Sequence, residues 1–390
     1  ASLKIQPMTN TANHSDTVKS SAPKVHLFNP ANDEALAGNN RWHTPSRHAL
    51  QYQHDCELLP IWWADDGDYI IAPHHTDAEI EATSRKANVK VNRYHPGTPA
   101  YPEPWGWSLD AKRQFQEAGM PDDCLPADQY ISWLRELSHR RLAIDVNSAL
   151  TKRSGISAPN HPRIYTDTSA LDVRGGDSCL LKRPWSSSGR GIFPTSTLTD
   201  DELKRLANGI IRRQGSVIVE DVLPKVADMS ALFHSDGTAI RHRAWSLFQT
   251  TSDGRYVGSI VAPQTGITSS LQTSGITYGD KTIDLACLAG LLADIFTDIV
   301  SVHYRGWIGV DMLAYRSGDA LLLAPCIEVN LRMTMGVVAT LLASRRAVSD
   351  TCTLLRTLPP EVATGDGCLR LAGRDHGFST VLEPHSGLPA

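Results

Sequence analysis

The sequence lacks the segments that mark a secreted or membrane protein. Its longest apolar stretch, Ile283 to Val302, is broken by Asp284, Asp294 and Asp298, so it predicts a core helix and not a membrane span. Residues 1–23 are rich in Ser, Thr, Asn and Lys and have no apolar centre, which predicts a disordered lead-in and not a signal peptide. Seven cysteines without paired spacing favour free thiols in a reducing compartment and exclude a disulfide framework. We therefore expect a cytoplasmic protein that does not bind membranes.

An excess of basic residues is also missing. The chain has 38 Lys and Arg against 42 Asp and Glu, a net charge of -4, so no general basic field would attract nucleic acid. The two best-known phosphate-binding loops are absent too, since no Gly-Lys-Ser/Thr closes a Walker loop and no GxGxxG turn occurs. With 390 residues the chain exceeds one ordinary core, and we expect two or three domains.

What the sequence does contain is a small-residue loop between two short apolar runs. The stretch Ser178 to Phe193, SCLLKRPWSSSGRGIF, predicts strand, flexible loop, strand, with Lys182 at the end of the first strand. Hydroxyls and main-chain N–H groups in such a loop can bind phosphate oxygens, and the lysine adds a point charge. A nucleoside triphosphate would suit it. An ordinary hairpin with a solvated Lys-Arg pair explains the stretch equally well on its own.

Oxygen ligands gather on a later hairpin. Asp311 lies on the strand Trp307 to Tyr315, while Glu328 and Asn330 stand two apart on its partner strand and so share a face. A register that puts Asp311 beside them makes a three-oxygen cluster that suits Mg²⁺. The alternative is a polar strand face in water. Apolar neighbours on the other face argue against it, and a buried Asp-Glu pair without a cation would be costly.

These features occur in the order found in ATP-grasp proteins. Lys182 and its loop come first, then the strand Val217 to Glu220 ending in an acid, then Asp228, and then the strands GWIGVDMLAY and IEVNLRMTMG. The chain resembles the carboxylate-amine ligase branch of that superfamily from about Arg140 to Leu342. The resemblance implies an α/β and α+β protein, with an N-terminal α/β domain before an ATP-grasp fold of two α+β subdomains. The implied boundaries are a lead-in (1–23), an N-terminal domain (24–138), a small subdomain with the lid loop (139–219), a large subdomain with the metal site (220–345) and a C-terminal extension (346–390).

The resemblance also implies roles for residues toward ATP. Lys182 would contact the α- and β-phosphates, Glu220 and the backbone around Val222 would lie at the adenine, and Asp228 would hold the ribose hydroxyls. A flexible lid over the β- and γ-phosphates would comprise Ser186, Ser187, Ser188, Gly189, Arg190 and Gly191. The family has a basic residue at the start of this half; His139-Arg140-Arg141 does not say which arginine is meant, and we predict Arg141.

The same resemblance places the metal and the reacting groups. Asp311, Glu328 and Asn330 would hold one or two Mg²⁺ ions, with Mn²⁺ as an alternative ion. Arg332 would lie near the transferred phosphate, which makes it a catalytic residue with Lys182.

Further basic and polar residues are candidates for substrate contacts. Arg241 and Arg243 alternate on one strand and are predicted to bind a substrate carboxylate or phosphate, Arg243 as a catalytic group; a solvated strand edge explains them equally well. Candidate acceptor-site residues in the first domain are Asn29, Asn32, Asp33 and Arg41. Asn32 or Asp33 capping the next helix is the alternative.

We therefore expect an ADP-forming ligase that uses ATP and Mg²⁺ to activate a carboxylate as an acyl phosphate for attack by an amine, with small-molecule acid and amine as partners. An ATP-binding module without ligase activity and a small-molecule kinase remain the alternatives. The sequence does not fix the oligomeric state.

Three local patterns complete the expectations. Leu58 to Trp63 predicts a strand, Asp128 to Ser154 predicts helical structure ending at Gly155, and Thr199 to Gln214 predicts an amphipathic helix with acids in its first turn and arginines in its last.

Overall fold

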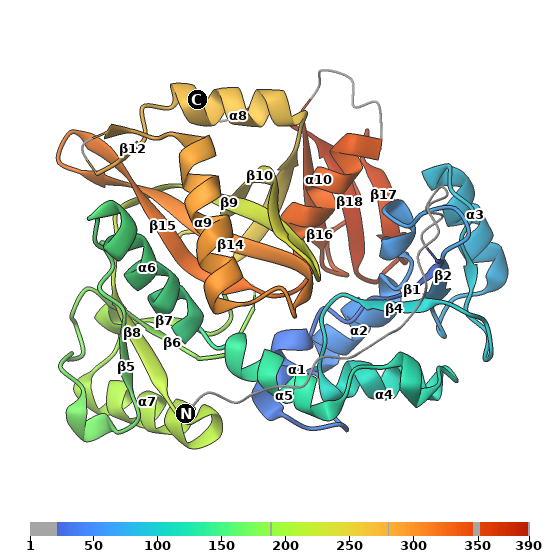
Figure 1. Ribbon diagram of the computed structural model, residues 1–390, viewed down its shortest axis with the longest axis horizontal. Coiled ribbons are helices and arrows are strands. Elements are labelled where there is room, and N and C mark those ends of the chain that lie inside the picture. Colours follow the sequence, from blue (N-terminus) through green and yellow to red (C-terminus); the bar gives the residue numbers. More distant parts are fainter. Residues whose placement is uncertain (1–21, 188, 280, 346–351, 389–390) are drawn as a thin grey trace.

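A computed structural model describes residues 22–187, 189–279, 281–345 and 352–388 (Figure 1). Almost all of the predicted lead-in, and the predicted lid residue Ser188, lie outside these ranges. The predicted mixed class is confirmed, because one parallel and two predominantly antiparallel sheets are packed with helices. None of the helices in the described ranges is long and apolar enough to cross a membrane.

The N-terminal part is a parallel sheet flanked by helices. Its strand order is β3-β2-β1-β4. Strand β1 therefore pairs on both sides, and its residues Val25 and Leu27 are buried. The strands are β1 (Lys24–Leu27), β2 (Tyr69–Ile71), β3 (Asn92–Arg93) and β4 (Tyr101–Pro104). The helices are α1 (Asn32–Gly38), α2 (Arg47–Asp55), α3 (Asp77–Ala87) and α4 (Leu109–Glu117), with short 3-10 turns η1 (Leu59–Trp62) and η2 (Asp122–Cys124).

The strand predicted at Leu58 to Trp63 is wrong, because these apolar residues form the 3-10 helix η1. Pro60 is the reason: it has no N–H to give to a sheet and is well suited to the first turn of a helix. The apolar run is buried as predicted, in a helical turn instead of a strand.

The helical stretch predicted over 128–154 is two helices, α5 (Asp128–Leu137) and α6 (Arg141–Ser154). The break occurs where the Nδ1 atom of His139 accepts a hydrogen bond from the backbone N–H of Arg141 at 2.9 Å, which starts the second helix. Gly155 ends α6 with a positive φ of 75°, as expected of a glycine at a helix C-terminus.

A small antiparallel sheet follows, in the order β5-β8-β6-β7, and α7 (Asp200–Gln214) packs on it. The helix predicted at 199–214 is confirmed, and Thr199 with Glu202 forms a capping box at its start. The strands are β5 (Arg163–Tyr165), β6 (Cys179–Lys182), β7 (Ile192–Pro194) and β8 (Val217–Asp221), with 3-10 turns η3 (Thr168–Ala170) and η4 (Thr195–Thr197).

The remaining strands form one large sheet in the order β13-β12-β15-β14-β9-β10-β11-β16-β18-β17. They are β9 (Lys225–Asp236), β10 (Ile240–Thr250), β11 (Tyr256–Val261), β12 (Thr277–Tyr278), β13 (Lys281–Thr282), β14 (Arg305–Ser317), β15 (Ala320–Asn330), β16 (Thr353–Leu358), β17 (Leu369–Gly373) and β18 (Ser379–Pro384). Strands from the predicted C-terminal extension thus continue the sheet of the large subdomain. The domain boundaries themselves stay predictions.

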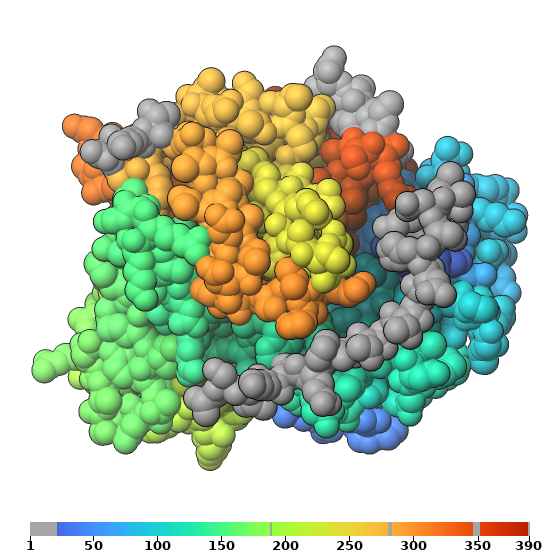
Figure 2. Space-filling model, viewed as in Figure 1, coloured from blue at the N-terminus to red at the C-terminus, as the bar shows by residue number. Residues whose placement is uncertain are grey.

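The two faces of the large sheet differ. Side chains such as Met229 and Ala231 point into the main core under α6, α8 (Gln264–Thr273) and α9 (Leu285–Ile299). The alternating residues Asp228 and Ser230 point to the other face, as the two-residue period of a strand requires. That face is partly covered by α10 (Met335–Arg345) and the N-terminal domain, and a hollow remains between them and the small sheet. In the space-filling view the small sheet (green) and the N-terminal domain (blue and cyan) flank the large sheet (yellow and orange) (Figure 2).

Candidate active site

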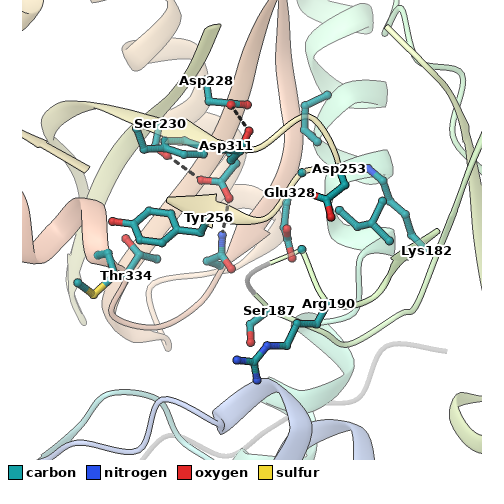
Figure 3. A pocket seen from close by; sticks show the side chains of 18 of the residues that line it. Lys182, Ser187, Arg190, Asp228, Ser230, Asp253, Tyr256, Asp311, Glu328 and Thr334 are labelled. Carbon is teal, nitrogen blue, oxygen red and sulfur yellow. Dashed lines mark hydrogen bonds between the residues drawn. The ribbon is translucent and has the colours of Figure 1, made fainter. Parts of the chain in front are cut away.

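A cavity of about 560 Å³ lies between the small sheet, the large sheet and the N-terminal domain, and its walls contain most of the residues predicted to bind ATP and metal (Figure 3). The predicted residues that line it are Lys182, Ser187, Gly189, Arg190, Glu220, Val222, Asp228, Asp311, Glu328, Asn330 and Arg332. They come from the small sheet, the lid loop and the large sheet. A site that binds a small molecule is expected to be such a concave space with a few converging polar groups.

Lys182 and Glu220 form a buried ion pair at the small-sheet side of the cavity. Their strands β6 and β8 are neighbours, and the Lys182 Nζ atom lies 2.5 Å from a Glu220 carboxylate oxygen. The same oxygen accepts a hydrogen bond from the Asn160 side chain at 2.9 Å, and the Asn160 oxygen is buried without a partner of its own. Both side chains of the pair are less than one-tenth exposed, so each charge is neutralised by the other and not by water. The apolar wall beside them includes Leu180, Val222 and Leu223.

Asp228 is held at the edge of the cavity. One of its carboxylate oxygens accepts hydrogen bonds from the Lys225 ammonium at 2.8 Å and from the Thr250 hydroxyl at 2.6 Å. Its role toward a ribose stays a prediction.

The predicted hairpin register is present: Asp311 pairs with Glu328, and Gly309 with Asn330. The Asp311 carboxylate accepts hydrogen bonds from the Ser230 hydroxyl at 2.7 Å and from the Asn330 amide nitrogen at 3.1 Å. Burial, and then the charge of Glu328, raise the pKa of Asp311 to about 6. The two carboxylates are neighbours on paired strands, and Glu328 is also 2.9 Å from the Arg140 guanidinium, so a divalent cation would bind beside that ion pair.

The donor set fits Mg²⁺ through two carboxylates. In the described parts of the chain no group of three or more His, Cys, Asp and Glu side chains is arranged to hold a metal. Mg²⁺ commonly uses only one or two protein carboxylates and completes its shell with water and phosphate. Asn330 turns its amide nitrogen toward Asp311 and its oxygen toward Arg332, so Asp311 and Glu328 are the stronger ligand candidates.

Arg332 is fixed beside this pair by Asp33 of the N-terminal domain. The guanidinium donates to both Asp33 oxygens, with the shortest contact from Nη2 at 2.6 Å, and to the Asn330 oxygen at 2.8 Å. Both side chains are nearly buried, at 11% and 13% exposed. Asp33, predicted to contact the acceptor, is thus placed as the partner of the predicted catalytic arginine, and it does not line the cavity.

The other predicted acceptor residues of the first domain are not in the cavity wall either. Asn29 is buried and exchanges hydrogen bonds with the backbone of Gly106, where Asn32 also packs. Arg41 donates to Gln116 at 3.2 Å and forms an ion pair with Asp128 on the outer side of the domain. These contacts organise the loop after β1, and they leave the acceptor to other side chains.

At the start of the predicted ATP-binding half, Arg140 contacts predicted site residues, whereas the predicted Arg141 does not lie among the residues that line the cavity; neither arginine does. Arg140 is buried, and its guanidinium lies 2.9 Å from Glu328 and donates to Ser186 in the lid at 3.1 Å. Arg141 is exposed and does not line the cavity. The sequence contained a signal that favours Arg140 over Arg141. Arg140 lies three residues before the buried Ala143 of α6, and residues three apart lie on the same face of a helix.

Arg241 and Arg243 are not brought to the site. Both are exposed near the β9–β10 turn, and Arg241 forms an ion pair with Asp236 at 2.6 Å. The regular alternation predicted for them is interrupted by a bulge between His242 and Ala244. Both arginines stand at the end of β10 opposite to Phe248 and Thr250, which line the cavity, so the alternative of a solvated strand edge describes their position.

The lid loop reaches across the cavity to the turn between β10 and β11. A Cβ atom at Gly189 would lie 2.4 Å from the Gly254 carbonyl oxygen, and Gly189 has a φ of +74°. Ser186 and Gly191 pack against each other at the root of the lid, where a Cβ on Gly191 would overlap the Ser186 side chain. Arg190 extends toward Glu34 of α1, 4.0 Å away.

The small and the large sheet thus enclose most of the residues that the ATP-grasp resemblance predicts for ATP and metal, beside an α/β domain.

No protein-family model and no curated protein sequence matches the chain. Among solved structures it is similar to N5-carboxyaminoimidazole synthetase from Staphylococcus aureus complexed with ADP, at 11% identity, with 96% of each chain covered and a TM-score of 0.45. It is also similar to the biotin carboxylase domain of Hydrogenobacter thermophilus 2-oxoglutarate carboxylase with MgADP. The identity is 13%, the match covers 94% of the present chain and 87% of that one, and the TM-score is 0.47. A third is N5-carboxyaminoimidazole ribonucleotide synthetase from Thermus thermophilus, at 14% identity, 93% and 94% coverage and a TM-score of 0.43. Similarity this distant assigns no activity to the present chain.

Proposed function

We propose that the protein is an ADP-forming ligase that activates a carboxylate with ATP and Mg²⁺ and joins it to an amine. The observation that carries the proposal is the convergence on one cavity of the buried Lys182 from the small sheet with two partly buried carboxylates and a partly buried arginine from the β14–β15 hairpin and the residues after it.

Residues on one side of the cavity would bind the nucleotide, and residues on the other side would act on the phosphate that is transferred. The apolar wall near Val222 suits a base, and Lys182 with the lid would hold the phosphates. Mg²⁺, when bound at Asp311 and Glu328, would neutralise phosphate charge. Arg332, held in one orientation by Asp33, would offer its guanidinium to the phosphate as it leaves ADP.

The reaction needs no protein nucleophile. A carboxylate oxygen of the acid attacks the γ-phosphorus, the bond to the β-phosphate oxygen breaks, and ADP and an acyl phosphate result. The amine then attacks the acyl carbon, loses a proton and displaces phosphate. The lid, which touches the β10–β11 turn, would keep water from the acyl phosphate.

The test has two parts. Calorimetric titration with ATP, with and without Mg²⁺, should show metal-dependent binding that weakens in both Lys182→Ala and Glu328→Gln. Lys204→Ala, an exposed lysine on α7, is the matched control and should bind ATP as the wild type does. In the second part hydroxylamine replaces the amine, because it converts an acyl phosphate into a hydroxamate that can be measured.

The outcomes separate the alternatives. Hydroxamate formed together with ADP supports the ligase. Phosphate that remains on a stable product would identify a kinase, and ATP binding without ADP release under any acid would identify a binding module. If the wild type does not bind ATP, or if both site variants bind ATP as tightly as the wild type, the site assignment is wrong.

A further inference from the structure

The cavity extends well beyond the groups that ATP and Mg²⁺ would use. Its floor runs across six adjacent strands of the large sheet, from β15 through β14, β9, β10 and β11 to β16. Asp311 lies on β14 and Tyr256 on β11, three strands away, which is roughly 14 Å at the usual spacing of strands. In the close-up, Lys182 and Tyr256 lie on opposite sides of Asp311 and Glu328 (Figure 3).

Aromatic rings line this far end. Tyr52 comes from α2, Phe248 from β10, Tyr256 from β11 and Phe378 from the turn before β18, and Trp105 follows β4. We call these five residues the aromatic end. Segments far apart in the sequence supply them, so the wall is a product of the tertiary fold.

The rings support one another. Tyr52 and Phe378 have centroids 5.5 Å apart, and Phe248 and Tyr256 have centroids 6.4 Å apart. Such contacts hold aromatic side chains in place at little further cost in entropy.

The polar atoms at this end are already engaged within the protein. The Tyr52 hydroxyl is 3.1 Å from the Thr357 hydroxyl, and the Tyr256 hydroxyl is 2.8 Å from the Ser259 hydroxyl. No charged side chain belongs to the aromatic end as defined, and its lining neighbours Ala49, Thr357 and Pro359 are uncharged. Asp228 stands opposite Phe248 on β9, and its carboxylate is already bonded by Lys225 and Thr250. A ligand carboxylate here would lose its water beside the negative charge of Asp228, whereas an uncharged ring would not carry that cost.

We propose, on the basis of the ligase function above, that the aromatic end binds the acid substrate, and that this acid carries an uncharged aromatic group at the end distant from its carboxylate. Arg332 lies at the boundary between the acid pair and this end, where the reacting carboxylate would lie. The aromatic group would then extend over β10 and β11 and pack on Phe248 and Tyr256.

The experiment compares two acids in the hydroxamate assay with MgATP. The probes are 3-phenylpropanoate, which has an aromatic end, and glutarate, which has a second carboxylate there. We expect kcat/KM to be about tenfold or more higher for 3-phenylpropanoate, the difference that burial of a ring in place of a charge supports.

Two variants locate the effect. Phe248→Ala should lower kcat/KM for 3-phenylpropanoate about tenfold and leave the Kd of ATP within about twofold. Thr357→Lys places a cation at the aromatic end and should shift the preference toward glutarate. Tyr101→Ala, which removes an exposed ring on β4, is the matched control and should change neither acid. Circular dichroism confirms that each variant is folded.

Each result decides one proposal. Equal use of the two acids by the wild type, or an unchanged preference in folded Phe248→Ala and Thr357→Lys, overturns the aromatic assignment and leaves the ligase intact. If ATP does not bind, the proposed function fails, and titration with 3-phenylpropanoate alone then judges the aromatic end: Phe248-dependent binding supports it and no binding overturns it.

Discussion

Removal of the Asp33 carboxylate should both destabilise the protein and disable Arg332. In Asp33→Ala the guanidinium stays buried and keeps only the Asn330 oxygen and the Met333 carbonyl as partners. Removing one member of a buried pair typically costs about 3–5 kcal/mol. The negative charges of Asp311 and Glu328 also favour the charged form of Arg332, so we expect the lower end of that range, about 3 kcal/mol.

The loss of function should exceed the loss of ATP binding. Without Asp33 the guanidinium is free to turn toward the acid pair, and it would no longer face the phosphate that the proposed reaction transfers. We expect the kcat of hydroxamate formation to fall about a hundredfold, while the Kd of ATP changes less than about threefold.

The assay is urea unfolding of a double-mutant cycle, with Asp33→Ala, Arg332→Met and both together. Glu34→Gln is the matched control for stability, because Glu34 is the next residue on α1 and its ion pair with the exposed Arg190 is long, at 4.0 Å. It should cost less than about 0.5 kcal/mol. If the orphaned charge is the cause, the double variant is more stable than Asp33→Ala alone; a double variant that is less stable than either single one would refute the reasoning.

Two further predictions concern the lid and a buried histidine. Gly189→Ala should weaken ATP binding in titration calorimetry, because its Cβ would strike the Gly254 carbonyl; Gly176→Ala, which has the same positive φ but open space around it, should leave binding unchanged. Burial, and then neighbouring arginines, lower the pKa of His139 to about 4, so the unfolded chain takes up a proton between pH 6.5 and pH 4 that the folded protein refuses. Stability should therefore fall with falling pH through this window, by about 2 kcal/mol from this group at pH 5, and His139→Gln should remove that part of the slope in urea unfolding at pH 7 and pH 5.

Much of the fold could be predicted because its signals are local. The acids in the first turn of α7, the glycine after α6 and the alternation around Asp311 act within a few residues, and each appears as predicted. The strand predicted at Leu58 to Trp63 failed because apolar residues alone do not separate a buried strand from a buried helical turn; Pro60 was the local sign of the turn.

The residues of the candidate site also fall into those that local sequence predicts and those that only the tertiary fold brings together. Residues on the hairpin and beside the lid loop could be read from spacing, because strand pairing fixes which side chains share a face. The partner of Arg332 could not, since Asp33 is 299 positions away in the sequence and is brought there only by domain packing. Arg241 and Arg243 lie away from the cavity because they stand near the β9–β10 turn, and which end of β10 reaches the cavity is set by the packing of the sheets and not by local sequence.

The N-terminal domain is part of the site and more than a neighbour of it. Asp33 orients Arg332, Glu34 meets the lid through Arg190, and Tyr52 and Trp105 wall the aromatic end. The small sheet contributes the lysine and the lid, so nucleotide and acceptor would be held by different parts of the chain across one carboxylate pair. If the loop acts as the predicted lid, its contacts with both the β10–β11 turn and α1 would require these parts to be in place together for closure. Closure would then depend on the acceptor side as well as on ATP, which couples protection of an acyl phosphate to the presence of the acid that forms it.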